Sequence, residues 1–164
     1  MPLTTIENQL SPKPRRSVLY MPANNLRAMQ KAQSLAADVI VFDLEDAVAP
    51  DQKANARELL TANIADLDFG GREVMLRVNG TDTQWHQYDI HCALALPISG
   101  IVLPKVESAK AVQVVIDVIN SQISNTVMSA DYTIWPMIET PTGVFAVRDI
   151  VNADAKVDCL VMGT

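Results

Sequence analysis

Short apolar runs alternate along the chain with amphipathic stretches. The run Val39–Phe42 places apolar side chains at successive positions, which is typical of a strand buried on both faces of a parallel sheet. Between such runs, apolar residues recur at helical spacing, as in Leu26, Met29 and Ala32. The pattern predicts strands over Ser17–Met21, Val39–Glu45, Glu73–Asn79, Gly100–Lys105, Tyr132–Glu139 and Asp158–Gly163. It predicts helices over Asn24–Ala37, Pro50–Leu67, Thr83–Leu96, Ser108–Ser121 and Pro141–Ala153.

This strict alternation of strand and helix predicts an α/β fold with a parallel sheet. Two architectures fit it, an open doubly wound sheet and part of a (β/α)8 TIM barrel. The segment after the first strand, "YMPANN", contains no glycine, which argues against the glycine-rich fingerprint of a dinucleotide-binding fold.

Composition narrows the function classes. The 164 residues include 13 basic and 19 acidic side chains, a net charge of −6, with no basic run to follow a phosphate backbone, so nucleic acid is not an expected partner. No apolar run approaches the roughly 20 residues of a membrane span, and the N-terminus lacks the apolar core of a signal peptide. We expect a cytoplasmic protein in which residues 1–14 form a flexible N-terminal arm and residues 15–164 form one domain.

Charged residues stand at the ends of four predicted strands. Because side chains alternate across a strand, Asp43 and Glu45 are expected to share one face with Val39 and Val41. The same counting puts Lys105 on one face with Ile101 and Leu103. Strand ends on the face that would line a barrel then carry Glu45, Arg77, Lys105 and Glu139. In both architectures the carboxyl ends of the strands are where ligands bind.

Each of these residues also has a structural interpretation. Asp46 could favour the N-terminus of the following helix, Lys105 could be a solvated loop residue, and Arg77 could pair with Glu45 or Asp43. These structural roles explain the four charged strand ends less well when the residues are taken together, because buried charge is costly unless it is paired or binds a metal. Clustered carboxylates suit Mg²⁺, and an arginine suits a substrate carboxylate. Such a site favours C–C cleavage beside a carbonyl, where a developing oxyanion needs stabilisation.

Six segments, in this order, resemble the successive conserved blocks of one enzyme family. They are "RRSVLYMPANN", "ADVIVFDLEDAVAPDQKANAR", "LRVNG", "GIVLPKVES", "WPMIETPTGV" and "DCLVMGT". The chain is similar to citrate lyase β-subunit-like (CitE-like) proteins of the HpcH/HpaI aldolase family, which are related to malyl-CoA and citramalyl-CoA lyases. The resemblance implies a (β/α)8 barrel, usually a homotrimer, that uses Mg²⁺ to cleave or form a C–C bond in an acyl-CoA thioester such as citryl-, malyl- or citramalyl-CoA. Its keto-acid partner would be oxaloacetate, glyoxylate or pyruvate.

The resemblance also implies roles for particular residues. Glu139 corresponds to the first metal ligand, and Arg77 to the arginine that holds the keto acid and polarises its carbonyl. Glu45 and Asp46 correspond to the acidic pair around the metal's waters, and Asp43 is expected behind them.

Two basic residues and one replacement complete the correspondence. Arg16 and Lys105 match basic positions near the substrate or the CoA phosphates. Ala23 stands where many relatives have glycine, although alanine also fits the citrate lyase branch.

Family members continue beyond the position of Thr164 with an aspartate that is the second metal ligand and with further βα units. We therefore expect a truncated barrel of about six strands and five helices that is inactive and poorly soluble by itself. Two other functions stay open at this point: an aldolase acting on a CoA-free hydroxy-keto acid, and a non-catalytic fragment.

Overall fold

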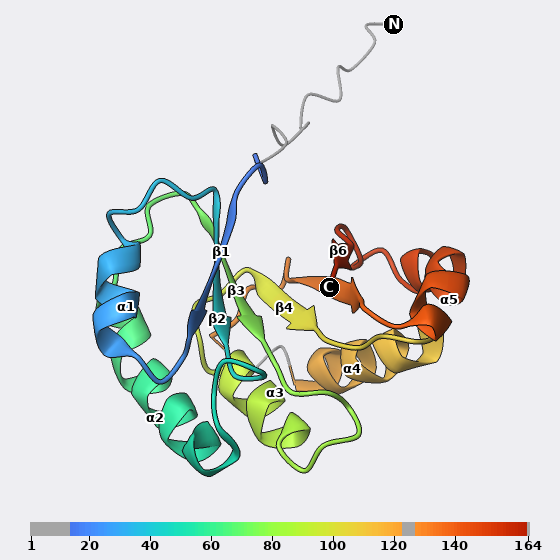
Figure 1. Ribbon diagram of the computed structural model, residues 1–164, viewed down its shortest axis with the longest axis horizontal. Helices are drawn as coiled ribbons and strands as arrows, with labels where there is room; N and C mark the ends of the chain where they lie inside the picture. Colours follow the sequence, from blue (N-terminus) through green and yellow to red (C-terminus); the bar gives the residue numbers. More distant parts are fainter. Residues whose placement is uncertain (1–13, 123–126, 164) are drawn as a thin grey trace, which may run out of the picture.

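The computed structural model describes residues 14–122 and 127–163, in which a curved sheet carries helices along one face (Figure 1). Its six strands are all parallel and follow one another in chain order across the sheet. They are β1 (Val18–Pro22), β2 (Val39–Asp43), β3 (Glu73–Arg77), β4 (Gly100–Leu103), β5 (Thr133–Ile138) and β6 (Val161–Met162).

One helix connects each pair of neighbouring strands. These are α1 (Leu26–Ala32), α2 (Lys53–Asn63), α3 (His86–Leu94), α4 (Ala109–Gln122) and α5 (Pro141–Val151), and short 3-10 turns, η1 (Pro50–Gln52) and η2 (Ile64–Asp66), flank α2. All five helices lie on the outside of the curved sheet (Figure 1). Sequential strand order with helices on one face is the arrangement of a (β/α)8 barrel, whereas a doubly wound sheet has helices on both faces and a reversal in strand order. The predicted partial TIM barrel is thus confirmed, and the open-sheet alternative is excluded.

Two apolar layers hold the sheet from its two sides. The layer under the helices is the larger one and includes Ile40, Phe42 and Leu76, all fully buried. A smaller cluster lines the inner, concave face. It comprises Val39, Val41, Met75, Val102, Trp135 and Met137. The predicted alternation of side chains is confirmed for β2, β3 and β5.

The prediction for β4 is wrong. Ile101 and Leu103 belong to the helix-side layer, and Val102 is the residue that faces inward. A regular strand running on to Lys105 would therefore direct that side chain towards the helices. The strand ends at Leu103 instead, and the chain turns before Lys105.

An ion-pair cluster closes the amino end of the inner face. Arg15 donates to both carboxylate oxygens of Glu73, at 2.7 and 2.8 Å, and to Asp158 at 2.7 Å. Its guanidinium carbon lies 4.7 Å from the ring centroid of Trp135, which is buried in the inner cluster. These contacts tie the segment before β1 to β3, to β5 and to the segment before β6 at the amino end of the inner face.

Most elements are shorter than predicted, and α1 and β6 lose the largest share of their predicted length. Helix α1 starts after Asn25, whose side chain accepts from the amide of Ala28, but it ends at Ala32 instead of Ala37. Tight i to i−3 backbone bonds, from Ser34 to Lys31 and from Leu35 to Ala32, replace the helical pattern there. Strand β6 has only two residues, Val161 and Met162, which pair with Met137 and Ile138 of β5; before it, Val157 forms an isolated parallel bridge with Ile134.

Two predictions concern the chain's surroundings and its N-terminus. No helix within the described residues is both long and apolar enough to span a membrane. Residues 1–13 of the expected flexible arm lie outside the described residues, so that expectation stays a prediction.

Gly100 gives a direct test of the sheet register. It pairs with Thr133 at the start of β4, and a Cβ at position 100 would lie 2.1 Å from the carbonyl oxygen of Thr133. Because backbone cannot yield as a flexible side chain can, Gly100→Ala is expected to lower the free energy of unfolding by about 1–3 kcal/mol, measured by urea denaturation. Gly71→Ala, where a Cβ meets nothing within 4 Å, is the control and is expected to be near neutral. Equal stability of the two variants would contradict this register.

Candidate active site

The carboxyl ends of β2 and β3 are joined by a buried ion pair. Arg77 donates from Nε to Oδ1 of Asp43 at 2.8 Å and from Nη2 to Oδ2 at 2.5 Å. Its Nη1 lies 3.1 Å from Oε2 of Glu45, the second carboxylate at the end of β2. The side chains of Asp43 and Arg77 are only 2% and 12% exposed. Pairing is what makes such burial of charge tolerable.

The pair with Asp43 affects both the pKa of Arg77 and the N–H groups of Arg77 that remain for a ligand. Burial by itself would lower the pKa of the guanidinium, but the hydrogen bonds and charge of Asp43 outweigh that effect and raise the pKa. The Nε/Nη2 edge, the edge suited to a bidentate grip on a carboxylate, already holds Asp43. Nη1 lies 3.1 Å from Glu45 and 3.9 Å from Sδ of Met137, and both Arg77 and Met137 line the inner cleft.

Lys105 reaches the same group of charges from the loop after β4. Its ammonium contacts Oε1 of Glu45 and lies 3.9 Å from Oδ1 of Asp46. The hydrogen bond that it donates to Glu45 raises its pKa. It arrives there through a left-handed backbone, with φ of 51°, because continuing the strand would have sent the side chain to the helix side.

Glu139 stands at the end of β5, facing the same opening. Its Oε1 accepts the backbone N–H of Lys105 at 2.8 Å. Among the described residues, no cationic side chain lies within 4 Å of its carboxylate, in contrast to Asp43, Glu45 and Asp46. Glu139 therefore keeps acceptor capacity that Asp43, bonded by Arg77 through both carboxylate oxygens, has already committed.

Two clefts are lined by carboxylates of this group. One of about 300 Å³ lies at the inner mouth and is lined by Tyr20, Asp46, Arg77, Met137, Glu139, Val161, Met162 and Gly163. The other, of about 530 Å³, lies between the loops that follow β2 and β3 and includes Glu45, Asp46, Lys53, Trp85 and Lys105. Asp46, whose side chain is 68% exposed, borders both.

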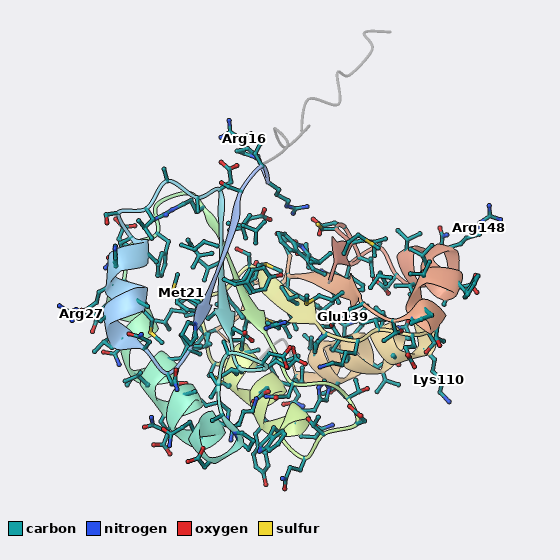
Figure 2. All side chains as sticks on the ribbon, viewed as in Figure 1. Arg16, Met21, Arg27, Lys110, Glu139 and Arg148 are labelled. Atoms are coloured by element: carbon teal, nitrogen blue, oxygen red, sulfur yellow. The ribbon has the colours of Figure 1, made fainter. Side chains whose placement is uncertain are left out.

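The structure thus brings together six of the seven predicted site residues, Asp43, Glu45, Asp46, Arg77, Lys105 and Glu139. Arg16 is the exception. It precedes β1 and forms a two-pronged ion pair with Asp38, at 2.8 and 3.0 Å, at the amino edge of the sheet. Figure 2 shows Arg16 at the upper end of the molecule, far from Glu139. The expected role of Arg16 near the substrate or the CoA phosphates stays a prediction; its neighbour in this chain is the carboxylate of Asp38, whose pKa it lowers to about 2.

One buried cation was missed by the sequence reasoning. Lys53, only 5% exposed, donates to the backbone carbonyls of Leu44 and Glu45, both at 2.7 Å. Burial lowers the pKa of its ammonium. The signal was present in the sequence: Lys53, Ala56 and Leu60 fall on one face of α2, so a lysine on the apolar face of an amphipathic helix already indicated a buried amine.

A second buried network holds the loop after β3. Asp89, fully buried on α3, accepts from Arg57 at 2.8 Å and from both the backbone and the side chain of Asn79 at 2.8 and 2.6 Å. The Asn79 amide also donates to the carbonyl of Leu44 at 3.0 Å. Regular alternation over the predicted strand Glu73–Asn79 would put Asn79 on the same face as Arg77, but β3 ends at Arg77 and the Asn79 side chain bonds to Asp89 of α3. Together with Lys53, this network fixes the main chain from which Glu45 projects.

The oxygen donors at the inner mouth fit a hydrated divalent cation in part. Asp46 and Glu139 border one cleft, and Mg²⁺ is commonly held by one or two carboxylates while it keeps several waters. Within residues 14–122 and 127–163, no three acidic, histidine or cysteine side chains are grouped closely enough to hold a metal by themselves. The predicted second ligand beyond Thr164 lies outside the described residues.

A model of one protein family matches nearly all of this chain. The match to HpcH/HpaI aldolase/citrate lyase covers residues 16–164. Two curated relatives are similar over most of the chain. A (3S)-malyl-CoA thioesterase of Cereibacter sphaeroides is 43% identical over 92% of the chain, and the mitochondrial citramalyl-CoA lyase of Homo sapiens is 32% identical over 88%. The chain spans about half the length of these relatives, 49% and 43% respectively.

Solved structures of CitE and of a citrate lyase beta subunit are similar in fold to most of this chain. The citrate lyase beta subunit of Mycobacterium tuberculosis, complexed with oxaloacetate and magnesium, superposes with a TM-score of 0.69 and 28% identity over 89% of this chain and 58% of its own. The CitE protein of the same organism, in complex with magnesium, acetoacetate and coenzyme A, also gives 0.69, with 27% identity over 89% of this chain and 48% of its own.

Removal of Asp43 tests the buried pair. Asp43→Asn leaves Arg77 with one carboxylate partner in a buried position, so we expect a loss of roughly 2–4 kcal/mol in the free energy of unfolding. Asp131→Asn, at an exposed position, removes the same charge and should change stability by less than about 0.5 kcal/mol. Both values come from chemical denaturation. Equal, small effects would show that the Asp43–Arg77 pair does not stabilise the mouth.

Proposed function

The chain belongs to the HpcH/HpaI aldolase/citrate lyase family, and from this premise we propose that the protein is a Mg²⁺-dependent lyase that cleaves or forms a C–C bond in a 3-hydroxyacyl-CoA thioester. The observation that carries the proposal is the inner cleft, where Arg77 faces the carboxylates of Asp46 and Glu139. A cationic group beside acceptors with spare capacity suits a substrate that carries both a carboxylate and a reacting carbonyl.

Each residue of the mouth has a role in this proposal. Glu139, with Asp46 near it, would hold Mg²⁺, which when bound supplies a Lewis acid for the substrate's oxygen atoms. Arg77 would bind the keto-acid part through its Nη1 side, since Asp43 keeps the other edge. Asp43 thereby orients Arg77 and is not itself in contact with substrate.

Cleavage requires the proton of the 3-hydroxyl group to leave as the C–C bond breaks. The bonding electron pair passes to the thioester, which becomes an enolate, and the α-carbon then takes a proton to give acyl-CoA; the other product is the keto acid or glyoxylate. Asp46 is the more exposed carboxylate of the acidic pair and would accept the hydroxyl proton. Glu45, held by Arg77 and Lys105, keeps those two cations in place.

The larger cleft would receive the thioester arm. Its volume of about 530 Å³ is in the range of small-molecule sites, and Lys105 at its border would meet an anionic part of the ligand. The CoA and keto-acid ligands of the CitE structures support this assignment of the substrate class. A homotrimer in the cytoplasm is part of the same proposal.

One relative favours a second function. The relative with 43% identity is named a (3S)-malyl-CoA thioesterase, and hydrolysis of the thioester would use the same substrate with water as the nucleophile. The products separate the two reactions: a lyase releases a keto acid or glyoxylate and keeps the thioester, while a thioesterase releases free CoA thiol and malate.

The test is a product assay with malyl-CoA and citramalyl-CoA. The 164-residue chain and, where the reading frame continues, its longer product are assayed side by side for carbonyl product and for free thiol. We expect carbonyl product without stoichiometric thiol, abolished by EDTA and restored by Mg²⁺. Thiol release without carbonyl product would assign the thioesterase instead.

Two further outcomes bear on the alternatives. If neither reaction occurs with any thioester while a CoA-free hydroxy-keto acid is cleaved, the protein is an aldolase. Turnover by the longer product but not by the 164 residues would agree with the expectation that this chain is inactive alone. Mg²⁺-independent lyase activity would contradict the proposed use of the metal.

A further inference from the structure

We propose that Lys105 is a positioning residue whose left-handed backbone, and not only its charge, sets the geometry of the acidic mouth. Its backbone N–H holds Glu139 and its ammonium holds Glu45. These two carboxylates come from the ends of β5 and β2, which are separated in the sheet by β3 and β4. The inference deepens the proposed function, because it takes Glu139 to be a metal ligand.

The backbone of Lys105 is in a conformation that costs free energy. Lys105 is the single non-glycine residue with positive φ in the described part of the chain. A side chain with a Cβ is strained in this region, and lysine lacks the short polar group that lets Asn and Asp adopt it more readily. Strain of this kind persists only where the surroundings impose it, and it is concentrated at functional sites.

The direction of β4 explains why the turn is needed. Ile101 and Leu103 pack under the helices, so regular alternation would bury the Lys105 side chain in an apolar layer. The left-handed residue reverses this, and both the amide and the side chain of Lys105 then reach the mouth. An exposed lysine that only balanced surface charge would not require this backbone.

The flanks of the turn are fixed independently of the lysine side chain. The amide of Val106 donates to the carbonyl of Met137 at 3.0 Å. The carbonyl of Val106 lies against the first turn of α5, where a Cβ on Gly143 would come within 2.6 Å of it. The loop is therefore held against β5 and α5, and position 105 is where its strain is concentrated.

Two variants separate backbone from charge. Lys105→Gly and Lys105→Ala both remove the ammonium, but glycine adopts positive φ freely and alanine does not. In the alanine variant the strain of positive φ remains while the ion pair with Glu45, which opposes relaxation in the unaltered chain, is lost, so the turn is expected to relax and release Glu139. Lys110→Ala, an exposed lysine on α4 that points into solvent in Figure 2, is the control for loss of one positive charge.

The first measurement is Mg²⁺ affinity by calorimetry on the intact chain. We expect Lys105→Gly to bind Mg²⁺ about fivefold or more tightly than Lys105→Ala, as follows from the cost of the left-handed conformation. A merely structural role would shift stability between these variants but leave their Mg²⁺ affinities equal. Lys110→Ala is expected to bind as the unaltered protein does; equal affinities of the two Lys105 variants would overturn the inference.

The second measurement does not depend on the metal. Amide hydrogen exchange, expressed as protection factors to correct for side-chain type, is followed at position 105. We expect the protection factor at position 105 to fall about tenfold or more in Glu139→Ala, which removes the acceptor, and in Lys105→Ala. We expect Glu139→Gln and Lys105→Gly to retain the protection of the unaltered chain. Val106, bonded to a backbone carbonyl, should be unchanged. Absence of Mg²⁺ binding by the unaltered chain would overturn the proposed function alone, whereas equal protection in all four variants would overturn the role of Lys105.

Discussion

Charge that converges at the carboxyl edge of a parallel sheet has to be neutralised within the protein or by a ligand. Because all six strands run in the same direction, the inner-face side chains that end them meet at one mouth. Asp43 and Arg77 neutralise each other's charge in a nearly fully buried ion pair, with two hydrogen bonds, between neighbouring strands. Breaking such a pair is costly because it leaves a buried charge without compensation. Glu45 and Lys105 extend this pair, because Glu45 contacts both Arg77 and Lys105.

The remaining acidic groups give the mouth its chemical character. Glu45 is bound by two cations, and the main chain beneath it is held by Lys53 and Asn79. Glu139 receives only a backbone N–H from within the described residues, and Asp46 is largely exposed. The site therefore combines a rigid, neutralised inner part with acceptors that are available to a cation. This is the type of preorganisation on which electrostatic catalysis depends.

Much of this arrangement could be predicted from the sequence, because it follows from periodicity. Alternation along β2 and β3 placed Asp43 and Arg77 on the inner face, and strand ends placed Glu139 at the mouth. Lys105 was placed at the mouth by the wrong argument, since alternation in β4 runs the other way and a left-handed residue corrects it. A single φ angle of this kind leaves no periodic trace in a sequence. The role expected for Arg16 came from the resemblance alone. Arg16 directly precedes the first predicted strand, so chain direction already placed it at the amino edge, away from the mouth.

The central claim is that this mouth binds Mg²⁺ through Glu139. Its most direct test is calorimetric titration of Mg²⁺ into the unaltered chain and into Glu139→Gln, which keeps the size of the side chain and removes its charge. The account predicts that the variant loses about tenfold or more in affinity, as expected when a group that contacts or orients a metal is lost. Glu107→Gln, an exposed change in the neighbouring loop, should leave the affinity unaltered. Equal Mg²⁺ affinity of the unaltered chain and Glu139→Gln would contradict the account.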